Sequence, residues 1–163
     1  MERVSKENYY LDIAETVAKR STCLRRCYGA IIVKNDEIIS TGYNGAPRGR
    51  KDCVDLSYCT REAMKIPSGQ RYELCRSVHA EANAIISAAR RDTLGATIYM
   101  ACRNPATGEL IADSSSCSMC RRLIINAGIE KIVIRDTATE YRVVDIHKEW
   151  VEEDDSLPEN LSL

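Results

Sequence analysis

Two short motifs, far apart in the chain, constrain its fold most strongly: His79-Ala80-Glu81 and Cys117-Ser118-Met119-Cys120. One imidazole and two thiolates form a ligand set for zinc, and three protein ligands leave the fourth tetrahedral position open to water. An open position is typical of a catalytic site rather than a structural one. We therefore expect His79, Cys117 and Cys120 to bind a catalytic Zn2+, with Glu81 beside them as the catalytic acid and base.

Helical geometry supports this pairing of motifs. Residues two apart do not face one another in a helix, so His79 and Glu81 can both address a metal only at the first turn. The apolar run over 82–89 predicts a mostly buried helix that begins there. The two cysteines fall on one face of the first turn of a second helix, 118–127, which Gly128 ends. Two helix N-termini then meet at the metal, and their dipoles favour thiolates.

Each motif alone has an ordinary interpretation. An isolated His-x-Glu on a helix is usually a solvated or core pair, and an isolated Cys-x-x-Cys can be a redox pair or half of a structural zinc site. Their occurrence together, each at the start of a helix, favours the catalytic zinc.

Length and charge limit the class of protein. A chain of 163 residues suffices for one domain, and 44% hydrophobic with 29% charged residues is typical of a globular fold. A formal net charge of -1 provides no basic field for a nucleic-acid polymer. Residues 1–10 contain no apolar signal core, and no stretch has membrane length, so we expect a cytoplasmic location without a membrane partner. In a reducing compartment, eight cysteines indicate metal binding rather than disulfides.

The hydrophobic pattern predicts an α/β fold. A first amphipathic helix is expected over 5–20 and a β-hairpin over 28–34 and 37–43, turning at Asn35-Asp36. Further strands are expected over 96–101, 131–135 and 141–146. The last of these follows too soon for a crossover helix, so it should pair antiparallel with its predecessor or leave the sheet. The expected result is a mixed sheet of about five strands with helices packed on it and the zinc site at two helix N-termini.

The insertion over 50–77 shows little periodicity and needs something to order it. Four thiolates closing one site would be a structural Zn2+ without an open position, and the alternative is four reduced, half-buried cysteines. The candidate ligands of this second site are Cys23, Cys53, Cys59 and Cys75. Cys27 and Cys102 remain as unpaired core thiols. We expect one domain over 1–152 and an acidic, polar tail over 153–163.

Several motifs in order resemble the deoxycytidylate (dCMP) deaminase family of the zinc-dependent cytidine deaminase superfamily. The resemblance covers roughly residues 22–135. The matching motifs are Ser21-Thr22-Cys23-x-Arg25-Arg26, Gly42-Tyr43-Asn44-Gly45-Ala46-Pro47, Cys75-Arg76-Ser77-Val78-His79-Ala80-Glu81 and Cys117-x-x-Cys120. In two respects the chain departs from the family pattern: Ser116 stands where proline usually precedes the first zinc cysteine, and there is no room for a helix between the last two strands.

The resemblance implies a cytidine-deaminase-like fold and hydrolytic deamination of dCMP to dUMP and ammonia, which supplies thymidylate synthesis. It implies a homo-oligomer, often a hexamer, with Asn44 near the sugar and the rest of its glycine-rich loop sensing triphosphates. In that case dCTP should activate and dTTP should inhibit. The candidate allosteric residues are Gly42, Tyr43, Gly45 and Arg90, the last placed near the end of the Glu81 helix. The candidate substrate-binding residues are Asn44, Arg26 and Ala80, with Arg26 as the cation for the phosphate.

The chemistry follows from the residues themselves. Zinc makes hydroxide available near neutral pH. Glu81 takes the water proton and passes it to the cytosine ring and then to the departing amine. The same chemistry serves dCTP, a free nucleoside or a modified pyrimidine, which are the nearest alternative substrates. A non-catalytic zinc-binding module is the alternative from another class, and it would have no use for Glu81.

Overall fold

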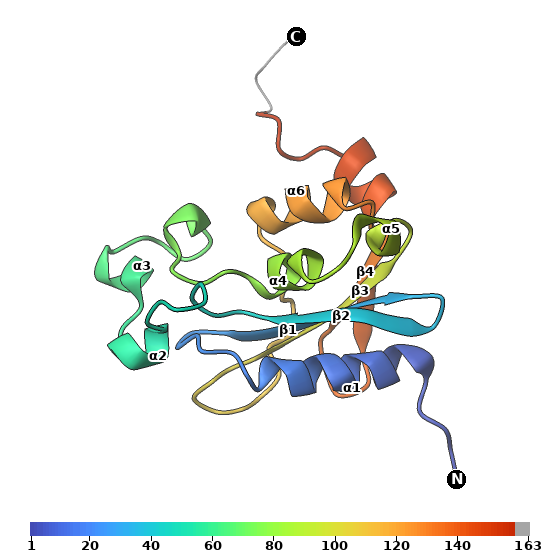
Figure 1. Cartoon of the computed structure of the whole chain (residues 1–163), viewed down its shortest axis with the longest axis horizontal. Helices are drawn as coiled ribbons and strands as arrows, with labels where there is room; N and C mark the ends of the chain where they lie inside the picture. Colours follow the sequence, from blue (N-terminus) through green and yellow to red (C-terminus); the bar gives the residue numbers. More distant parts are fainter. Residues whose placement is uncertain (159–163) are drawn as a thin grey trace.

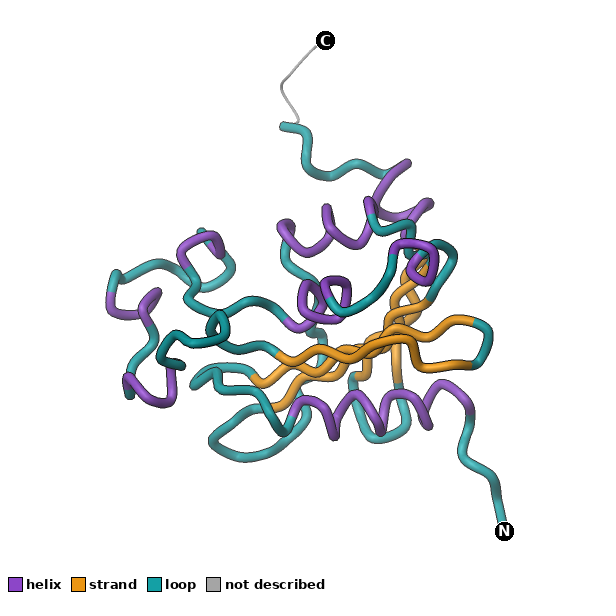
Figure 2. The backbone as a smooth tube through the Cα atoms, viewed as in Figure 1, coloured by secondary structure: helices purple, strands orange, loops and turns teal. Residues whose placement is uncertain are grey.

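The computed structural model describes residues 1–158, and its core is a five-stranded sheet with the strand order β2-β1-β3-β4-β5 (Figures 1 and 2). The strands are β1 (Cys27–Lys34), β2 (Glu37–Tyr43), β3 (Thr97–Arg103), β4 (Lys131–Arg135) and β5 (Tyr141–Asp145). Only β3 and β4 run parallel, and the other neighbours are antiparallel. The expected mixed sheet is therefore confirmed, and the last strand takes the antiparallel pairing with its predecessor.

The hairpin between β1 and β2 turns where the sequence predicts it. Asn35 and Asp36 have φ values of 52° and 62°, the left-handed pair that a two-residue type I′ turn requires. The Tyr10 hydroxyl donates a hydrogen bond of 2.5 Å to the Asp36 carboxylate. The turn is thus fastened to the helix that crosses beneath it.

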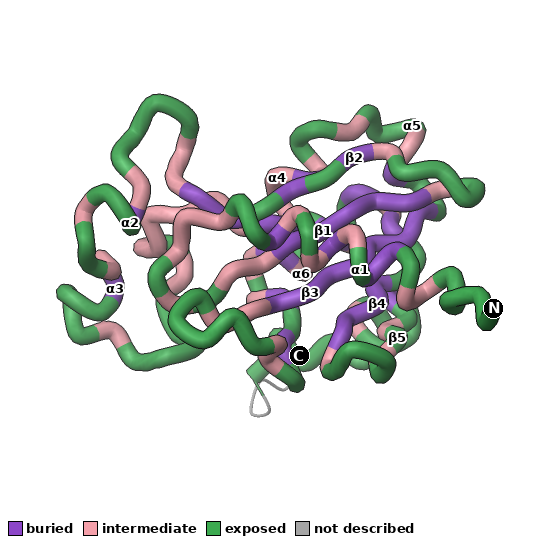
Figure 3. Tube along the Cα trace, turned by 90° about the horizontal axis from the view of Figure 1, so that it is seen from below, coloured by how far each residue is buried: buried purple, intermediate pink, exposed green. Residues whose placement is uncertain are grey.

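Helices cover both faces of the sheet (Figure 1). Helix α1 (Lys6–Ala18), capped by Ser5, lies on one face, and α4 (Ala80–Ile86), α5 (Arg90–Thr93) and α6 (Ser118–Asn126) lie on the other. Side chains of a strand alternate between faces, so Ile31 packs with the α1 cluster and Ile32 with the opposite cluster. Figure 3 shows the resulting buried stripe along the central strands.

Two glycines allow helices to approach the sheet closely. A Cβ on Gly29 would lie 2.0 Å from the carbonyl oxygen of Ala14 in α1. A Cβ on Gly42 would lie 2.3 Å from the carbonyl oxygen of Ala80 in α4. Neither distance is compatible with a side chain, so both positions require glycine at the given depth of each helix.

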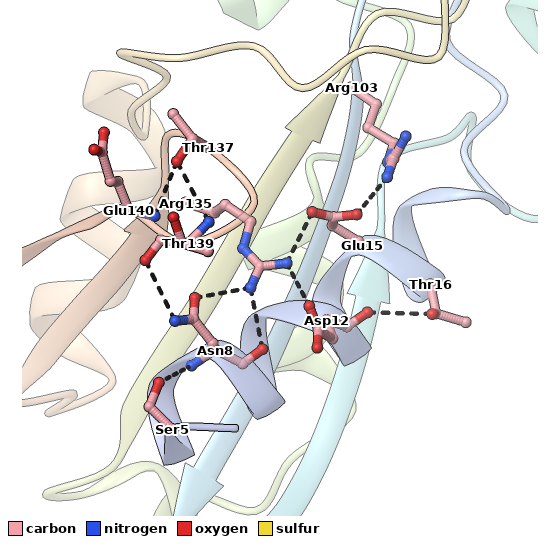
Figure 4. A network of polar contacts seen from close by, with 10 residues as sticks. All are labelled: Ser5, Asn8, Asp12, Glu15, Thr16, Arg103, Arg135, Thr137, Thr139 and Glu140. Carbon is pink, nitrogen blue, oxygen red and sulfur yellow. Dashed lines mark hydrogen bonds and ion pairs between the residues drawn. The ribbon is translucent and has the colours of Figure 1, made fainter. Parts of the chain in front are cut away.

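A buried arginine ties α1 to the end of β4 (Figure 4). Arg135 is 1% exposed and donates hydrogen bonds to Asp12 at 2.7 Å and to Glu15 at 2.9 Å. It also donates to the backbone and side-chain oxygens of Asn8. Arg103, at the end of β3, pairs with the same Glu15 (Figure 4). A buried guanidinium needs such partners, and here α1 supplies them.

The Glu81 helix is shorter than the sequence suggested. Helix α4 ends at Ile86, the chain becomes extended at Ala89, and α5 begins at Arg90. The placement of Arg90 near the end of the Glu81 helix was therefore wrong. Helix α4 itself is buried or half-buried except at its last residue, Ile86, which is 74% exposed. Arg90 instead donates to the Asn126 carbonyl, 2.7 Å away at the end of α6. A cation is favourable at that helix end, where carbonyls lack partners.

The insertion over 50–77 contains the short helices α2 (Cys53–Leu56), α3 (Thr60–Ala63) and η1 (Tyr72–Leu74). Much of it is exposed, in contrast to the central strands (Figure 3).

After β5 the chain forms η2 (His147–Glu152), a helix that the sequence pattern did not predict. The apolar residues Leu161 and Leu163 lie outside the described residues. Among residues 1–158, no helix has the length and apolar character needed to cross a membrane.

Candidate active site

Helix α4 begins at the site and presents both residues of the first motif. His79 is its N-cap, with extended φ and ψ of -73° and 157°, so the chain changes direction between His79 and Glu81. This break in helical geometry lets side chains two residues apart address one point, as the motif requires. The preceding Val78 pairs through both backbone groups with Gly45, at 2.8 and 3.2 Å, so the glycine-rich loop lies against the start of α4.

Helix α6 supplies the second motif in the same manner. Cys117 is its N-cap and Cys120 lies in its first turn, as predicted. The sulfur atoms of Cys117 and Cys120 each lie 3.4 Å from Nδ1 of His79. Tetrahedral zinc with Zn–N of about 2.0–2.1 Å and Zn–S of about 2.3 Å implies N···S separations of about 3.6 Å. The three residues thus fit zinc, and their ligand atoms all lie within 4.8 Å of one another.

Hydrogen bonds within the triad shift the pKa values of all three residues. A hydrogen bond from Cys120, followed by one from His79, lowers the pKa of the Cys117 thiol to about 4. The same bonding, together with burial, raises the pKa of Cys120. Contact with Cys117 and Cys75 raises the pKa of His79 to about 10. A metal binds the deprotonated ligands, so it would take Cys117 as the thiolate already favoured here and would displace the protons of His79 and Cys120.

Glu81 is 3% exposed and lies beside the triad. Burial raises the pKa of its carboxyl group, and the charge of His79 acts in the opposite direction. A carboxyl group with a raised pKa can both accept and return a proton near neutral pH, which is what an acid-base catalyst needs.

A cavity of about 290 Å³ opens over His79, Glu81 and Cys117. Two of the three expected substrate-binding residues, Asn44 and Arg26, also line it. The third, Ala80, is completely buried and is not among the lining residues. The structure thus brings the predicted catalytic residues and two candidate binding residues to one cavity.

The Asn44 side chain is engaged in holding the loop before β1. Its Oδ1 accepts hydrogen bonds from the Ser21 hydroxyl at 2.5 Å and the Tyr28 backbone at 2.9 Å. Its Nδ2 donates to the carbonyl of Arg26 at 2.8 Å. Asn44 is thereby the residue that fixes the backbone of Arg26 and Tyr28 at the wall of the cavity.

Six lining residues were not identified from the sequence: Tyr28, Arg61, Glu62, Ser68, Tyr72 and Ser115. The Tyr72 ring meets the His79 ring edge-on at 5.6 Å, and the Arg61 guanidinium lies 4.3 Å above the centre of the same tyrosine ring. Arg61 is buried and also donates to the carbonyls of Pro67 and Gln70. No periodicity marks Arg61 and Tyr72, because they belong to the insertion and gain their roles only through tertiary contacts.

The four cysteines of the expected second site are neighbours. The pKa of the Cys53 thiol is raised first by burial and then by Cys23, Cys75 and Cys59. Burial is the largest influence on the pKa of Cys75 and acts to raise it, but the hydrogen bonds to His79 and Ser77 and the charges of His79 and Arg61 together lower it. Within the described part of the chain, only His79, Cys117 and Cys120 form a group of three ligand atoms at metal-binding distance. The second zinc site therefore stays a prediction.

Comparison with known proteins identifies the family. The model described as "Cytidine and deoxycytidylate deaminase zinc-binding region" matches residues 4–136. The chain belongs to this family. Family membership confirms the resemblance drawn from the motifs and agrees with the His-Cys-Cys geometry of the site.

Curated relatives and solved structures agree with this assignment. The deoxycytidylate deaminase of Mycobacterium phage D29 is 38% identical over 138 residues, covering 82% of this chain and 96% of the relative. The Schizosaccharomyces pombe deoxycytidylate deaminase is 32% identical over 131 residues, covering 80% of this chain but 37% of the relative. The dCMP deaminase from cyanophage S-TIM5, crystallised with dCMP and dUMP, has a TM-score of 0.54 at 24% identity, covering 82% and 84% of the two chains. This likeness confirms the cytidine-deaminase-like fold.

Proposed function

We propose that the protein is a zinc-dependent dCMP deaminase that hydrolyses dCMP to dUMP and ammonia. The observation that carries the proposal is the buried carboxyl group of Glu81 beside a triad whose N···S distances fit zinc with an open position. Relatives named deoxycytidylate deaminase support this substrate, as does the cyanophage enzyme that binds dCMP and dUMP. The product would supply thymidylate synthesis.

The residues of this chain divide the work. His79, Cys117 and Cys120 would hold the metal, which supplies Lewis-acid activation of water near neutral pH. Glu81 accepts a proton from the attacking water and delivers it to N3 of cytosine as the water oxygen forms a bond to C4. It then takes the proton of the C4 hydroxyl and gives it to the amine, so that the C4–N bond breaks and ammonia leaves. The enclosed position of Glu81 keeps bulk water from competing for the proton.

We infer that arginines at the cavity bind the 5′-phosphate. Arg26 lines the cavity, and its hydrogen bond to Tyr28 supports a fixed orientation of the guanidinium. Arg25, on the same wall, is paired with Glu62 at 3.0 Å.

The experiment that tests the function is ammonia release from dCMP, dCTP, deoxycytidine and CMP by the purified protein. Preference for dCTP or deoxycytidine would favour the alternative of another small cytosine substrate.

We further propose that Cys23, Cys53, Cys59 and Cys75 bind a structural zinc. Cys53 begins α2, Cys59 caps α3 and Cys75 ends η1, so one metal would join three separate pieces of the insertion. These short helices bury little apolar surface of their own, and a metal would offset the entropy of ordering them.

Regulation by triphosphates is a separate proposal. A second cavity of about 200 Å³ lies against the glycine-rich loop and is lined by three arginines: Arg20, Arg48 and Arg50. Tyr43 and Gly45, two of the candidate allosteric residues, line the same cavity. Three guanidinium groups beside glycine-rich backbone suit a polyphosphate. We propose that dCTP binds here as an activator and dTTP as an inhibitor.

We propose that the protein assembles as a homo-oligomer, with a hexamer as the expected form. The exposed apolar side chains of Ile86 on α4 and Leu123 on α6 support a subunit interface on this face. Light scattering at micromolar concentration tests the assembly, and a fully active monomer would contradict it. Location in the cytoplasm and the domain boundary after residue 152 stay predictions.

A further inference from the structure

The segment 113–116 forms the last part of the chain before the first zinc cysteine. Ser115 lines the active-site cavity, and Ser114 and Ser116 on either side of it are buried. The segment has no regular secondary structure, so helical or sheet bonding does not hold it in place. Its position must come from side chains of neighbouring elements.

The end of β4 and strand β5 hold the beginning of the segment. Asp136, which follows β4, accepts a hydrogen bond of 2.8 Å from the backbone N–H of Asp113. Arg142 in β5 donates to both oxygens of Asp136, at 2.8 and 3.0 Å, and to the carbonyl oxygen of Ser114 at 2.6 Å. The planar guanidinium thus joins a carboxylate and a backbone carbonyl that lie on different parts of the chain.

A second arginine holds the other end of the segment. Arg121 in α6 donates to the Ser116 carbonyl at 3.2 Å and to the Ser115 hydroxyl at 3.4 Å. Its guanidinium lies 5.0 Å above the centre of the Trp150 ring, in η2, and 3.4 Å from the carboxylate of Asp155. Trp150 and Asp155, near the C-terminus, therefore fix the orientation of the Arg121 guanidinium.

We propose that Arg121 and Arg142 are positioning residues that fix segment 113–116, and with it Ser115, at the substrate-facing wall of the cavity. The two guanidinium groups act on the carbonyls of Ser114 and Ser116, on either side of Ser115, so removing either one frees one end of the segment. Displacement of a binding group by about 1 Å is costly in an enzyme site. This inference rests on the proposed deaminase function for its kinetic consequence, but the placement of the segment itself does not.

The first test compares Arg121→Ala and Arg142→Ala with Arg122→Ala, a control at an exposed neighbouring position on α6. Loss of a supporting contact typically lowers activity about 10- to 100-fold. We expect the KM for dCMP to rise by about that factor in both test variants, with kcat changed by less than about threefold and the zinc content unchanged. The control should match the wild type. A KM within about twofold of wild type in both variants would overturn the proposal.

The second test is hydrogen exchange of the backbone amides of 113–116 in the same zinc-loaded proteins, without substrate. Faster exchange in Arg142→Ala and Arg121→Ala, but not in Arg122→Ala, is the expected result. Unchanged exchange in both test variants would refute the placement of the segment by these arginines. If the wild type fails to deaminate dCMP, the proposed function is wrong, while the exchange experiment still decides whether the arginines hold the segment.

Discussion

The two cysteine-containing regions differ in how the fold delivers their sulfur atoms. Cys117 and Cys120 stand at the start of α6, a helix of 9 residues that packs against α4 and adds Ile124 to the hydrophobic core. Cys53 and Cys59 stand at helices of 4 residues in the insertion. Packed secondary structure alone brings the first pair to metal-binding distance of His79. The cysteines of the insertion are near enough to affect the pKa of Cys53, but they do not form a group at metal-binding distance. A catalytic site needs a geometry that exists before the metal arrives, and a structural site can obtain its geometry from the metal.

The largest effect expected is on the chemistry at the preformed site. Glu81→Gln keeps the shape of the side chain but cannot carry a proton, so we expect kcat to fall by roughly 10²- to 10⁴-fold with zinc retained. Steady-state kinetics and metal analysis measure this, with Glu130→Gln, an exposed position, as the control. Turnover of dCMP at a rate near that of the wild type would disprove the role of Glu81.

Metal analysis of cysteine variants tests the comparison directly. Cys117→Ser should remove the catalytic zinc and the activity while the insertion keeps its metal. Cys53→Ser should remove the other zinc and lower the thermal stability, because the short helices lose their common ligand. Cys27→Ser, at a thiol assigned to neither site, should retain two zinc ions. A zinc content of one in the wild type, unchanged by Cys53→Ser, would show that the insertion is ordered without metal.

A smaller effect is expected at the second cavity, where we propose that dCTP and dTTP bind. Arg48→Ala should abolish activation by dCTP and inhibition by dTTP while basal turnover of dCMP persists, because the cavity loses one of its three cations. Arg90→Ala tests another of the candidate allosteric residues, which is not among the lining residues of this cavity. A lower Tm is expected from the loss of its bond to the end of α6, and an unchanged response to both triphosphates would remove Arg90 from the allosteric candidates. Velocity curves that ignore both triphosphates in the wild type would remove the regulatory proposal.

The smallest effect concerns the hairpin turn on the side of the sheet away from the metal. The hydrogen bond to Asp36 is the main cause that raises the pKa of Tyr10 to about 12. An unfolded tyrosine has a pKa of about 10, so this contribution to stability is complete below pH 10 and is lost as the pH rises toward 12. The unfolding free energy of Tyr10→Phe should therefore fall less steeply over that range than that of the wild type. Tyr9→Phe, at a more exposed ring, should follow the wild type.

The sequence was sufficient where local pattern and chemistry coincide. The strand periods, the turn at Asn35 and the cysteine spacing predicted the sheet and the triad because each is decided within a few residues. Tyr72 could not be predicted, since its contact with His79 depends on how the insertion folds back. Arg90 was misplaced because nothing in an alanine-rich run reveals that the chain becomes extended at Ala89.

The absence of a side chain at Gly42 has a mechanical consequence. Ala80 touches the space where a Cβ would stand, so the depth of α4 on the sheet is set by contact between two backbones. Two backbones in contact cannot move closer together, whereas a side chain can change its rotamer. The contact therefore fixes the position of α4 next to His79 and Glu81. The loop that lines the second cavity leaves the sheet one residue later, at Tyr43. A shift in that loop would thus move the end of β2 and, through this backbone contact, the helix that presents His79 and Glu81.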